Sequence, residues 1–166
     1  MNNRQSDRQK EFGELFRTYY APMVLYATRL FGNVTDAEDV VQDVFSQLLL
    51  SGQPLTVFGR VKAYLFTVLH NKIIDALRYQ QRHRREALID VHVGDSLEEA
   101  IFELDVYARL YEEIEKLPVK NAHVLQLKLQ GKSDREIAAL LDIKYETVRS
   151  HVKHGIASLR GKLSTY

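Results

Sequence analysis

KSDREIAALLDIKYETVRSHVKHGIASLRGKL, residues 132–163, decides how the C-terminal part of this chain folds. Ser133 followed three residues later by Glu136 is a capping box, which predicts a helix that begins at Asp134. After a short turn, a second helix is predicted over residues 145–163, because its apolar side chains recur at helical spacing. Those side chains are Val148, Val152, Ile156, Leu159 and Leu163.

The second predicted helix also has a polar and basic face. Its exposed positions are expected to be Tyr145, Glu146, Thr147, Arg149, Ser150, Lys153 and His154. Two helices joined by a tight turn bind DNA by placing the N-terminal residues of the second helix against base edges in the major groove. The stretch therefore predicts a helix-turn-helix that contacts DNA.

The composition of the 166 residues is that of a globular chain without a catalytic set. Hydrophobic residues make up 45% and charged residues 27%, and the chain has no cysteine, which excludes disulfides and thiolate metal sites. The six histidines lack the spacing of a metal site, and neither a glycine-rich phosphate loop nor a nucleophile elbow occurs. We expect no enzymatic activity, no cofactor and no metal.

No segment of the sequence indicates export or membrane insertion. The first ten residues, MNNRQSDRQK, carry positive charges with no apolar segment behind them. No apolar run approaches the roughly 18 residues of a membrane span. A cytoplasmic location is expected.

Charge divides the chain into three blocks, although the net charge is only +1. Residues 86–115 contain ten acidic residues and one basic residue, whereas the blocks before and after them have a basic excess. Helical periodicity weakens after residue 85, and a turn signal ends at Ser96. We therefore predict one domain over residues 1–85, an acidic linker over 86–96 and a second domain over 97–166. Each basic block alone could be a solvated face, but two of them on separate domains favour a shared polyanion.

Capping boxes and apolar periodicity predict helices throughout both domains, so the fold is expected to be all-α. A helix over residues 8–31 is expected to be kinked or divided at Pro22. Thr35 with Glu38 predicts the start of the next helix, and Ser96 with Glu99 predicts the first helix of the second domain. About four helices are expected in the second domain and at least three in the first.

The helix that follows Thr35 is predicted to have an acidic face. Asp39, Gln42 and Asp43 lie opposite its apolar stripe, to which Phe45 belongs. Carboxylates four residues apart repel each other modestly unless a basic group lies near. The face is therefore a candidate protein contact, with a plain solvated surface as the alternative.

A loop over residues 51–59 and a helix from about residue 60 to 81 complete the first domain. Phe58 is apolar within the loop. The helix carries a stripe of polar and aromatic side chains with a basic end: Tyr64, Thr67, Asn71, Lys72, Asp75 and Arg78. Aromatic rings stack on unpaired bases and cations neutralise phosphates, so the stripe suits a nucleic-acid strand. Alternatively, Tyr64 belongs to the core, and Asn71 and Asp75 link neighbouring helices.

Three motifs in this order resemble the extracytoplasmic-function (ECF) sigma factors of the sigma-70 family, from about Phe12 to Leu163. DAEDVVQDVF at 36–45 is similar to region 2.2 of that family, and YLFTVLHNKIIDALR at 64–78 is similar to regions 2.3 and 2.4. LPVKNAHVLQLKLQGKSDREIAALLDIKYETVRSHVKHGIASLR at 117–160 is similar to region 4. The resemblance implies a subunit that binds core RNA polymerase and directs transcription from specific promoters.

The resemblance also implies a role for each candidate surface. Asp39, Gln42 and Asp43 would bind the clamp helices of the largest polymerase subunit, with Phe45 supporting the packing at this polymerase-binding face. The C-terminal domain would meet the flap. Phe58, Tyr64, Asn71, Lys72, Asp75 and Arg78 would bind the −10 element. The face that begins at Tyr145 would read the −35 element, with Arg149 and Lys153 reaching guanine edges or phosphates. Family members are commonly inhibited by an anti-sigma factor, so one is an expected partner.

Two residues depart from the family pattern in the helix-turn-helix. Asp142 stands where a glycine or small residue is usual, and Asp adopts left-handed backbone more readily than most residues. Lys144 replaces the usual Ser or Thr cap. Two rival hypotheses remain at this stage: a stand-alone helix-turn-helix regulator with an N-terminal dimerisation or sensing domain, and a helical adaptor that docks other proteins.

Overall fold

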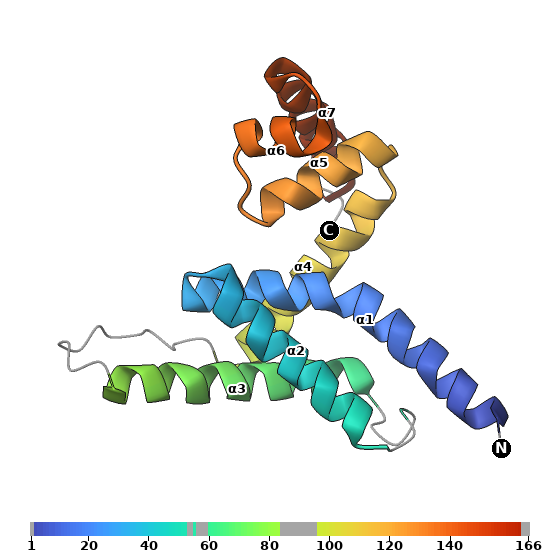
Figure 1. The fold of residues 1–166 in the computed structure, drawn as a ribbon, viewed down its shortest axis with the longest axis vertical. Helices are drawn as coiled ribbons and strands as arrows, with labels where there is room; N and C mark the ends of the chain where they lie inside the picture. Colours follow the sequence, from blue (N-terminus) through green and yellow to red (C-terminus); the bar gives the residue numbers. More distant parts are fainter. Residues whose placement is uncertain (1, 53–54, 56–59, 84–95, 164–166) are drawn as a thin grey trace. The chain divides into compact units, whose positions relative to one another are not determined.

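The computed structural model describes residues 2–52, 55, 60–83 and 96–163, which form seven α-helices in two compact units. The helices are α1 (Asn2–Phe31), α2 (Val34–Leu50), α3 (Val61–His83), α4 (Leu97–Glu115), α5 (Val119–Leu129), α6 (Asp134–Leu141) and α7 (Tyr145–Leu163) (Figure 1). One unit spans residues 1–108 and the other residues 109–166. The described part of the chain has no strand, as the all-α prediction requires.

The N-terminal unit is a three-helix arrangement of α1, α2 and α3, to which the first half of α4 is added. Its core is filled by large side chains from each helix, including Met23, Tyr26, Val41, Phe45, Leu65, Phe66, Leu69 and Leu104. Burial of these side chains stabilises the unit by about 1.5–3 kcal/mol for each large residue, before the entropy of ordering is subtracted. Rigid helices result, and their outward faces carry the candidate contact residues.

The C-terminal unit packs α5, α6 and α7 around two small apolar clusters. One cluster joins Ile114 of α4 to Leu125 and Leu159, and the other joins Val124 to Ile137 and Val148. The apolar positions predicted for residues 132–163 therefore face this core. Ile156 and Leu163 are exceptions, with 44% and 41% exposure, because they lie on the outer side of α7.

Two predicted helix starts differ from the structure. α1 begins at Asn2 instead of residue 8 and continues unbroken through Pro22. α2 begins at Val34, where Asn33 accepts the backbone N–H of Asp36 at 2.8 Å, so Asn33 is the N-cap and the predicted capping box at Thr35 does not form. Asn33 caps the helix in preference to Thr35 because Asn is a stronger N-cap residue than Thr.

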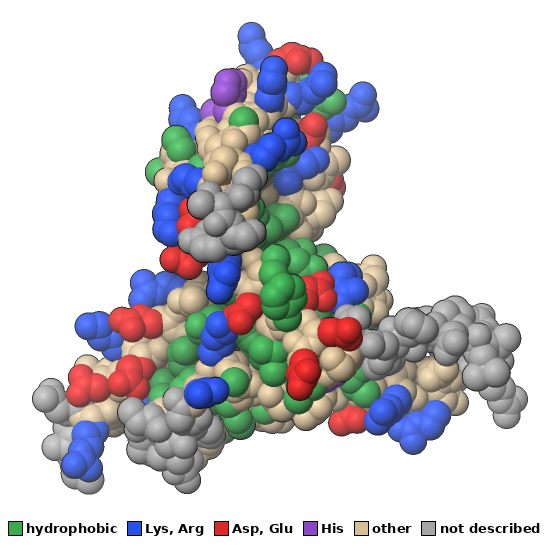
Figure 2. All heavy atoms as spheres, turned by 180° about the vertical axis from the view of Figure 1, so that it is seen from behind, with side chains coloured by type: hydrophobic (Ala, Val, Ile, Leu, Met, Phe, Trp, Pro, Cys, Tyr) green, Lys and Arg blue, Asp and Glu red, His purple; other side chains and the backbone are tan. Residues whose placement is uncertain are grey.

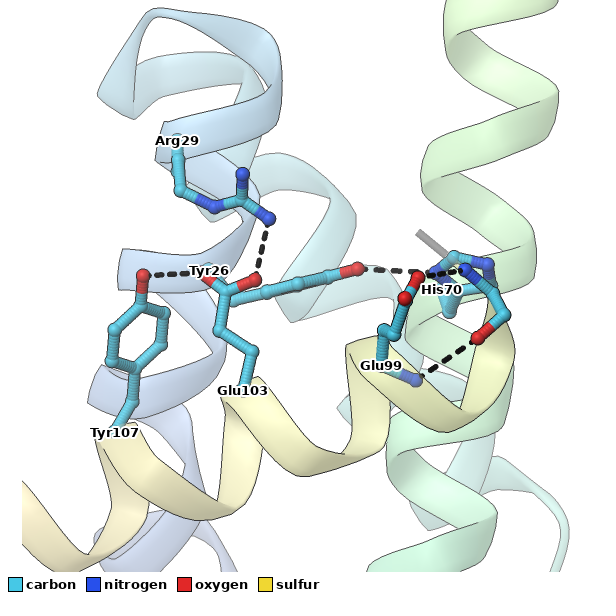
Figure 3. A network of polar contacts seen from close by, with 7 residues as sticks. Tyr26, Arg29, His70, Glu99, Glu103 and Tyr107 are labelled. Carbon is cyan, nitrogen blue, oxygen red and sulfur yellow. Dashed lines mark hydrogen bonds and ion pairs between the residues drawn. The ribbon is translucent and has the colours of Figure 1, made fainter. Parts of the chain in front are cut away.

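The division between the compact units lies inside α4, beyond the predicted linker. Residues 97–108 pack with the N-terminal unit, where Ala100 and Leu104 are fully buried. Glu103 accepts a hydrogen bond from Arg29 at 2.5 Å and another from Tyr107 (Figure 3). Asp105 pairs with Lys62 of α3. The Arg29–Glu103 and Lys62–Asp105 contacts join residues far apart in sequence, so local composition could not reveal them.

Candidate nucleic-acid interface

The acidic face of α2 is exposed as the sequence predicts. Asp39, Gln42 and Asp43 all lie on the surface, opposite the buried stripe of the same helix. The Gln42 amide lies 3.5 Å from the Tyr20 hydroxyl of α1, a long and weak hydrogen bond. The face is thus available to a partner that carries basic groups.

Phe45 does not share this face. Its side chain is 2% exposed, and its ring packs edge-on against Phe12 and Phe16 of α1, with centroids 6.0 and 5.0 Å away. Two residues along a helix turn a side chain through about 200°, so a residue two after Asp43 faces the core. The Phe45 ring therefore holds α2 against α1 from the inside, which agrees with its expected role of supporting the packing beneath the acidic face.

Asp43 and Lys72 meet across α2 and α3. The Lys72 Nζ donates to Asp43 Oδ2 at 2.5 Å, and the Gln47 amide approaches the same oxygen at 3.4 Å. The Lys72 side chain is 27% exposed and that of Asp43 53%. Sequence reasoning assigned these residues to different surfaces, yet the fold brings them together.

The polar stripe of α3 lies largely on the surface. Asn71, Asp75 and Arg78 are exposed, and Tyr64 is 36% exposed, so this ring is not a core residue. Opposite the stripe, Leu65, Leu69 and Ile73 are buried. One helix therefore presents an aromatic ring, amide and carboxylate groups and cations along one side. Phe58 lies outside the described residues.

Beyond Arg78, the end of α3 adds polar residues that the predicted site omitted. A hollow of about 350 Å³ is lined by Asp75, Arg78, Gln81 and Arg82. Next to it, the Tyr79 ring is 58% exposed and stacks on His83 with centroids 3.9 Å apart. The sequence could have predicted that Gln81 and Arg82 extend this surface, because residues three and four positions after Arg78 share its helix face.

The helix-turn-helix forms as predicted around two backbone features. Ser133 accepts the N–H of Glu136 at 3.2 Å, while the Glu136 carboxylate accepts the N–H of Ser133 at 2.7 Å. This backbone hydrogen bond lowers the pKa of Glu136 below its usual value. Asp142 adopts φ 51° and ψ 50°, the left-handed conformation that the turn requires.

The outer face of α7 presents most of the predicted DNA-contacting set. Tyr145, Glu146, Arg149, Ser150, Lys153 and His154 are exposed, whereas Thr147 is half-buried. The Arg149 guanidinium lies 5.9 Å from the centre of the Tyr145 ring, which holds it beside the start of the helix. Lys144 supplies the first helical carbonyl, to the N–H groups of Thr147 and Val148. In Figure 2, Lys, Arg and His side chains gather over the C-terminal unit.

Other classes of site find no support in the described residues. They contain no group of three or more His, Asp or Glu side chains placed to bind a metal. Of the helices described, none is both long and apolar enough to cross a membrane. His151, from the middle of α7, instead lies 2.6 Å from the Asn121 side chain.

Comparison with known proteins assigns both units. Residues 15–83 match Sigma-70 region 2, and residues 107–159 match Sigma-70, region 4. The ECF RNA polymerase sigma factor SigE of Mycolicibacterium smegmatis is 32% identical over 92% of this chain, which spans 62% of the length of SigE. The ECF RNA polymerase sigma factor SigW of Bacillus subtilis is 25% identical over 93% of this chain and 90% of the length of SigW. The ECF RNA polymerase sigma factor SigL of Mycobacterium tuberculosis is 30% identical over 88% of this chain and 85% of the length of SigL. The chain belongs to the ECF RNA polymerase sigma factors of the sigma-70 family.

Proposed function

We propose that this sigma factor, which directs promoter-specific transcription initiation with RNA polymerase, uses three separate helical faces for that work. Its partners are core RNA polymerase and promoter DNA. The observation that carries the proposal is the separation of charge: the acidic face lies on α2, whereas exposed cations lie along α3 and α7. A protein surface with basic groups and a DNA backbone can then be bound at the same time.

The acidic face of α2 is proposed to dock on the clamp helices of the largest polymerase subunit. Asp39, Gln42 and Asp43 would meet basic side chains there, and Phe45 would act only by holding α2 in place. Repulsion between Asp39 and Asp43, one helical turn apart, falls when a cation approaches both. The C-terminal unit is proposed to meet the flap.

The α3 stripe is proposed to lie along the non-template strand of the −10 element. Tyr64 would stack on an unpaired base, and Lys72 and Arg78 would neutralise phosphates. Phe58 and its loop would receive a flipped base, whose unstacking costs a few kcal/mol and is offset by contacts in a pocket.

The outer face of α7 is proposed to enter the major groove of the −35 element. Arg149 is exposed at the start of the helix, where side chains of a recognition helix reach base edges. Lys153, one turn further on, would contact a phosphate or guanine. The protein would work in the cytoplasm, catalyse no reaction itself, and be held inactive by an anti-sigma factor.

Run-off transcription with purified core polymerase tests these assignments. The protein should start transcripts at a specific promoter that core polymerase alone ignores. Arg149→Ala should weaken −35 recognition by about 1–3 kcal/mol if the side chain reads a base. The double change Asp39→Ala with Asp43→Ala should reduce assembly with core polymerase.

Two outcomes would contradict the proposal. Unchanged assembly of the Asp39 and Asp43 double variant would exclude the clamp contact. The rival hypothesis of a stand-alone helix-turn-helix regulator would be favoured by two results together. These are tight binding of the free protein to duplex promoter DNA, and no promoter-specific transcript when the protein is added to core polymerase.

A further inference from the structure

An ion pair links two surfaces that are proposed to bind different partners. Asp43 belongs to the acidic face of α2, and Lys72 belongs to the stripe of α3. Their charged atoms lie 2.5 Å apart, close enough for a charge-assisted hydrogen bond. Each charge is therefore already neutralised inside the protein before either partner arrives.

Using either charge for a partner weakens the internal pair. A basic side chain of the polymerase that takes the Asp43 carboxylate leaves the Lys72 ammonium without its acceptor. A phosphate that takes Lys72 likewise leaves Asp43 without its donor. Lys72 has the smaller exposed fraction, 27%, so much of its stem is held by the protein and its ammonium has limited freedom to serve both groups.

We propose that the Asp43–Lys72 pair couples polymerase binding to DNA binding. The inference rests on the proposed function, since it takes the α2 face as the polymerase contact and the α3 stripe as the DNA contact. Docking of α2 on the polymerase releases Lys72 toward the DNA backbone, so the free protein binds DNA more weakly than the assembled one does. Because coupling between two binding sites is reciprocal, release of Asp43 must also favour the polymerase.

The neighbouring charges strengthen this arrangement. Asp39 lies one turn before Asp43 on the exposed side of α2, and Asp75 lies three residues after Lys72 on α3. Without Lys72, Asp43 would lose its ion-pair partner while Asp39 still lies one turn away, and a cationic partner would then be more strongly attracted. The effect remains modest because a partly exposed ion pair contributes about 0.2–1 kcal/mol, which corresponds to a factor of up to about five in affinity.

The first arm of the test measures assembly with core polymerase in the absence of DNA. Lys72→Met keeps most of the length of the side chain and removes its charge. The variant should bind core polymerase about two- to fivefold more tightly than the unchanged protein, although it loses a proposed DNA contact. Lys10→Met removes a cation from the exposed part of α1 in the same unit and should leave the affinity within error.

The second arm measures binding of a labelled oligothymidine to the free protein by fluorescence anisotropy at low salt. Asp43→Asn should raise the affinity about two- to fivefold by releasing Lys72, and it should have no such effect when Lys72 is already Met. Glu38→Gln removes one negative charge from the exposed surface of the same helix and controls for net charge.

The outcomes separate failure of this inference from failure of the proposed function. If the unchanged protein does not assemble with core polymerase at all, the proposed function is wrong. If it assembles but Lys72→Met binds no more tightly than Lys10→Met, the coupling is wrong. The coupling is also wrong if Asp43→Asn raises the affinity for oligothymidine no more than Glu38→Gln does. It is wrong as well if Asp43→Asn raises this affinity equally in the unchanged protein and in the Lys72→Met variant.

Discussion

The two units of this sigma factor are stabilised in different ways. The N-terminal unit depends on contacts between distant residues: the aromatic rings of Phe12, Phe16 and Phe45, and the Arg29–Glu103 and Lys62–Asp105 pairs. The C-terminal unit depends more on local features, such as the capping box of α6 and the left-handed residue in its turn. Side-chain packing should therefore contribute most to the stability of the N-terminal unit, whereas backbone geometry should contribute more to the stability of the C-terminal unit.

The largest expected effect is the loss of the Phe45 ring. Phe45→Ala leaves a cavity beneath the acidic face of α2 and should destabilise the N-terminal unit by about 3–5 kcal/mol. Hydrogen exchange of α2 amides in the full chain would measure the loss. Ser46→Ala, at the exposed neighbouring position, should change exchange little. A loss below about 1 kcal/mol would mean that α2 repacks without the ring.

The next effect tests how closely the helices approach in the C-terminal unit. A Cβ atom at Gly155 would lie 2.6 Å from Leu125 Cδ1 and 3.1 Å from its Cγ, and Leu125 is itself buried. Gly155→Val should therefore cost about 1–3 kcal/mol by overpacking. Exchange of α5 and α7 amides would report it.

A second glycine on α7 supplies the control. A Cβ at Gly161 would meet nothing within 4 Å, so Gly161→Val should not destabilise the unit. Equal costs at the two glycines would show that helix propensity, rather than the contact with Leu125, controls the result.

The same capping motif occurs in both units, which makes a sharper comparison. Ser133→Ala removes the cap of α6, a helix of 8 residues, and should cost about 1 kcal/mol. Ser96→Ala removes the same motif from α4, which has 19 residues and keeps its buried contacts further along, so we expect a smaller loss. Thermal unfolding of the two variants would measure the difference, and equal losses would contradict the argument.

The Glu136 carboxylate gives the α6 cap a pH dependence. Its pKa is lowered in the folded protein because it accepts the N–H of Ser133, so its stabilising contribution is present above the usual pKa of 4.5. The contribution is lost as the pH falls through the lower folded value. Glu136→Ala removes the carboxylate and should therefore destabilise less in acid than at neutral pH, and a constant difference would exclude this coupling.

Local features could be predicted from the sequence, whereas contacts between distant residues could not. The helix-turn-helix, its capping box and the left-handed Asp142 depend on neighbours within a few positions. Asp43–Lys72 and Arg29–Glu103 join residues 29 and 74 positions apart, and helical periodicity does not say which faces meet. The start of α2 was predicted from Thr35 with Glu38, whereas Asn33 is the residue that caps the helix.

The smallest expected effect compares two tyrosines of α4, one in each unit. Tyr107 and Tyr111 both have their pKa raised to about 12, and burial is the largest cause for each. For Tyr107, the hydrogen bond to Glu103 and the negative charge of Glu103 raise the pKa further, although Arg29 lowers it. Glu103 therefore acts on the Tyr107 ring, and Figure 3 shows the hydrogen bond between them.

Glu103→Gln should lower the pKa of Tyr107 from about 12 toward 10, without reaching it, and leave Tyr111 unchanged. The raised pKa stabilises the folded protein fully below pH 10, and this contribution is lost as the pH rises toward 12. The variant should lose part of that contribution. NMR titration of tyrosines labelled at Cζ would follow each ring separately. A parallel shift of both rings would mean that the substitution disturbs α4 as a whole, and an unmoved Tyr107 would mean that burial alone sets its pKa.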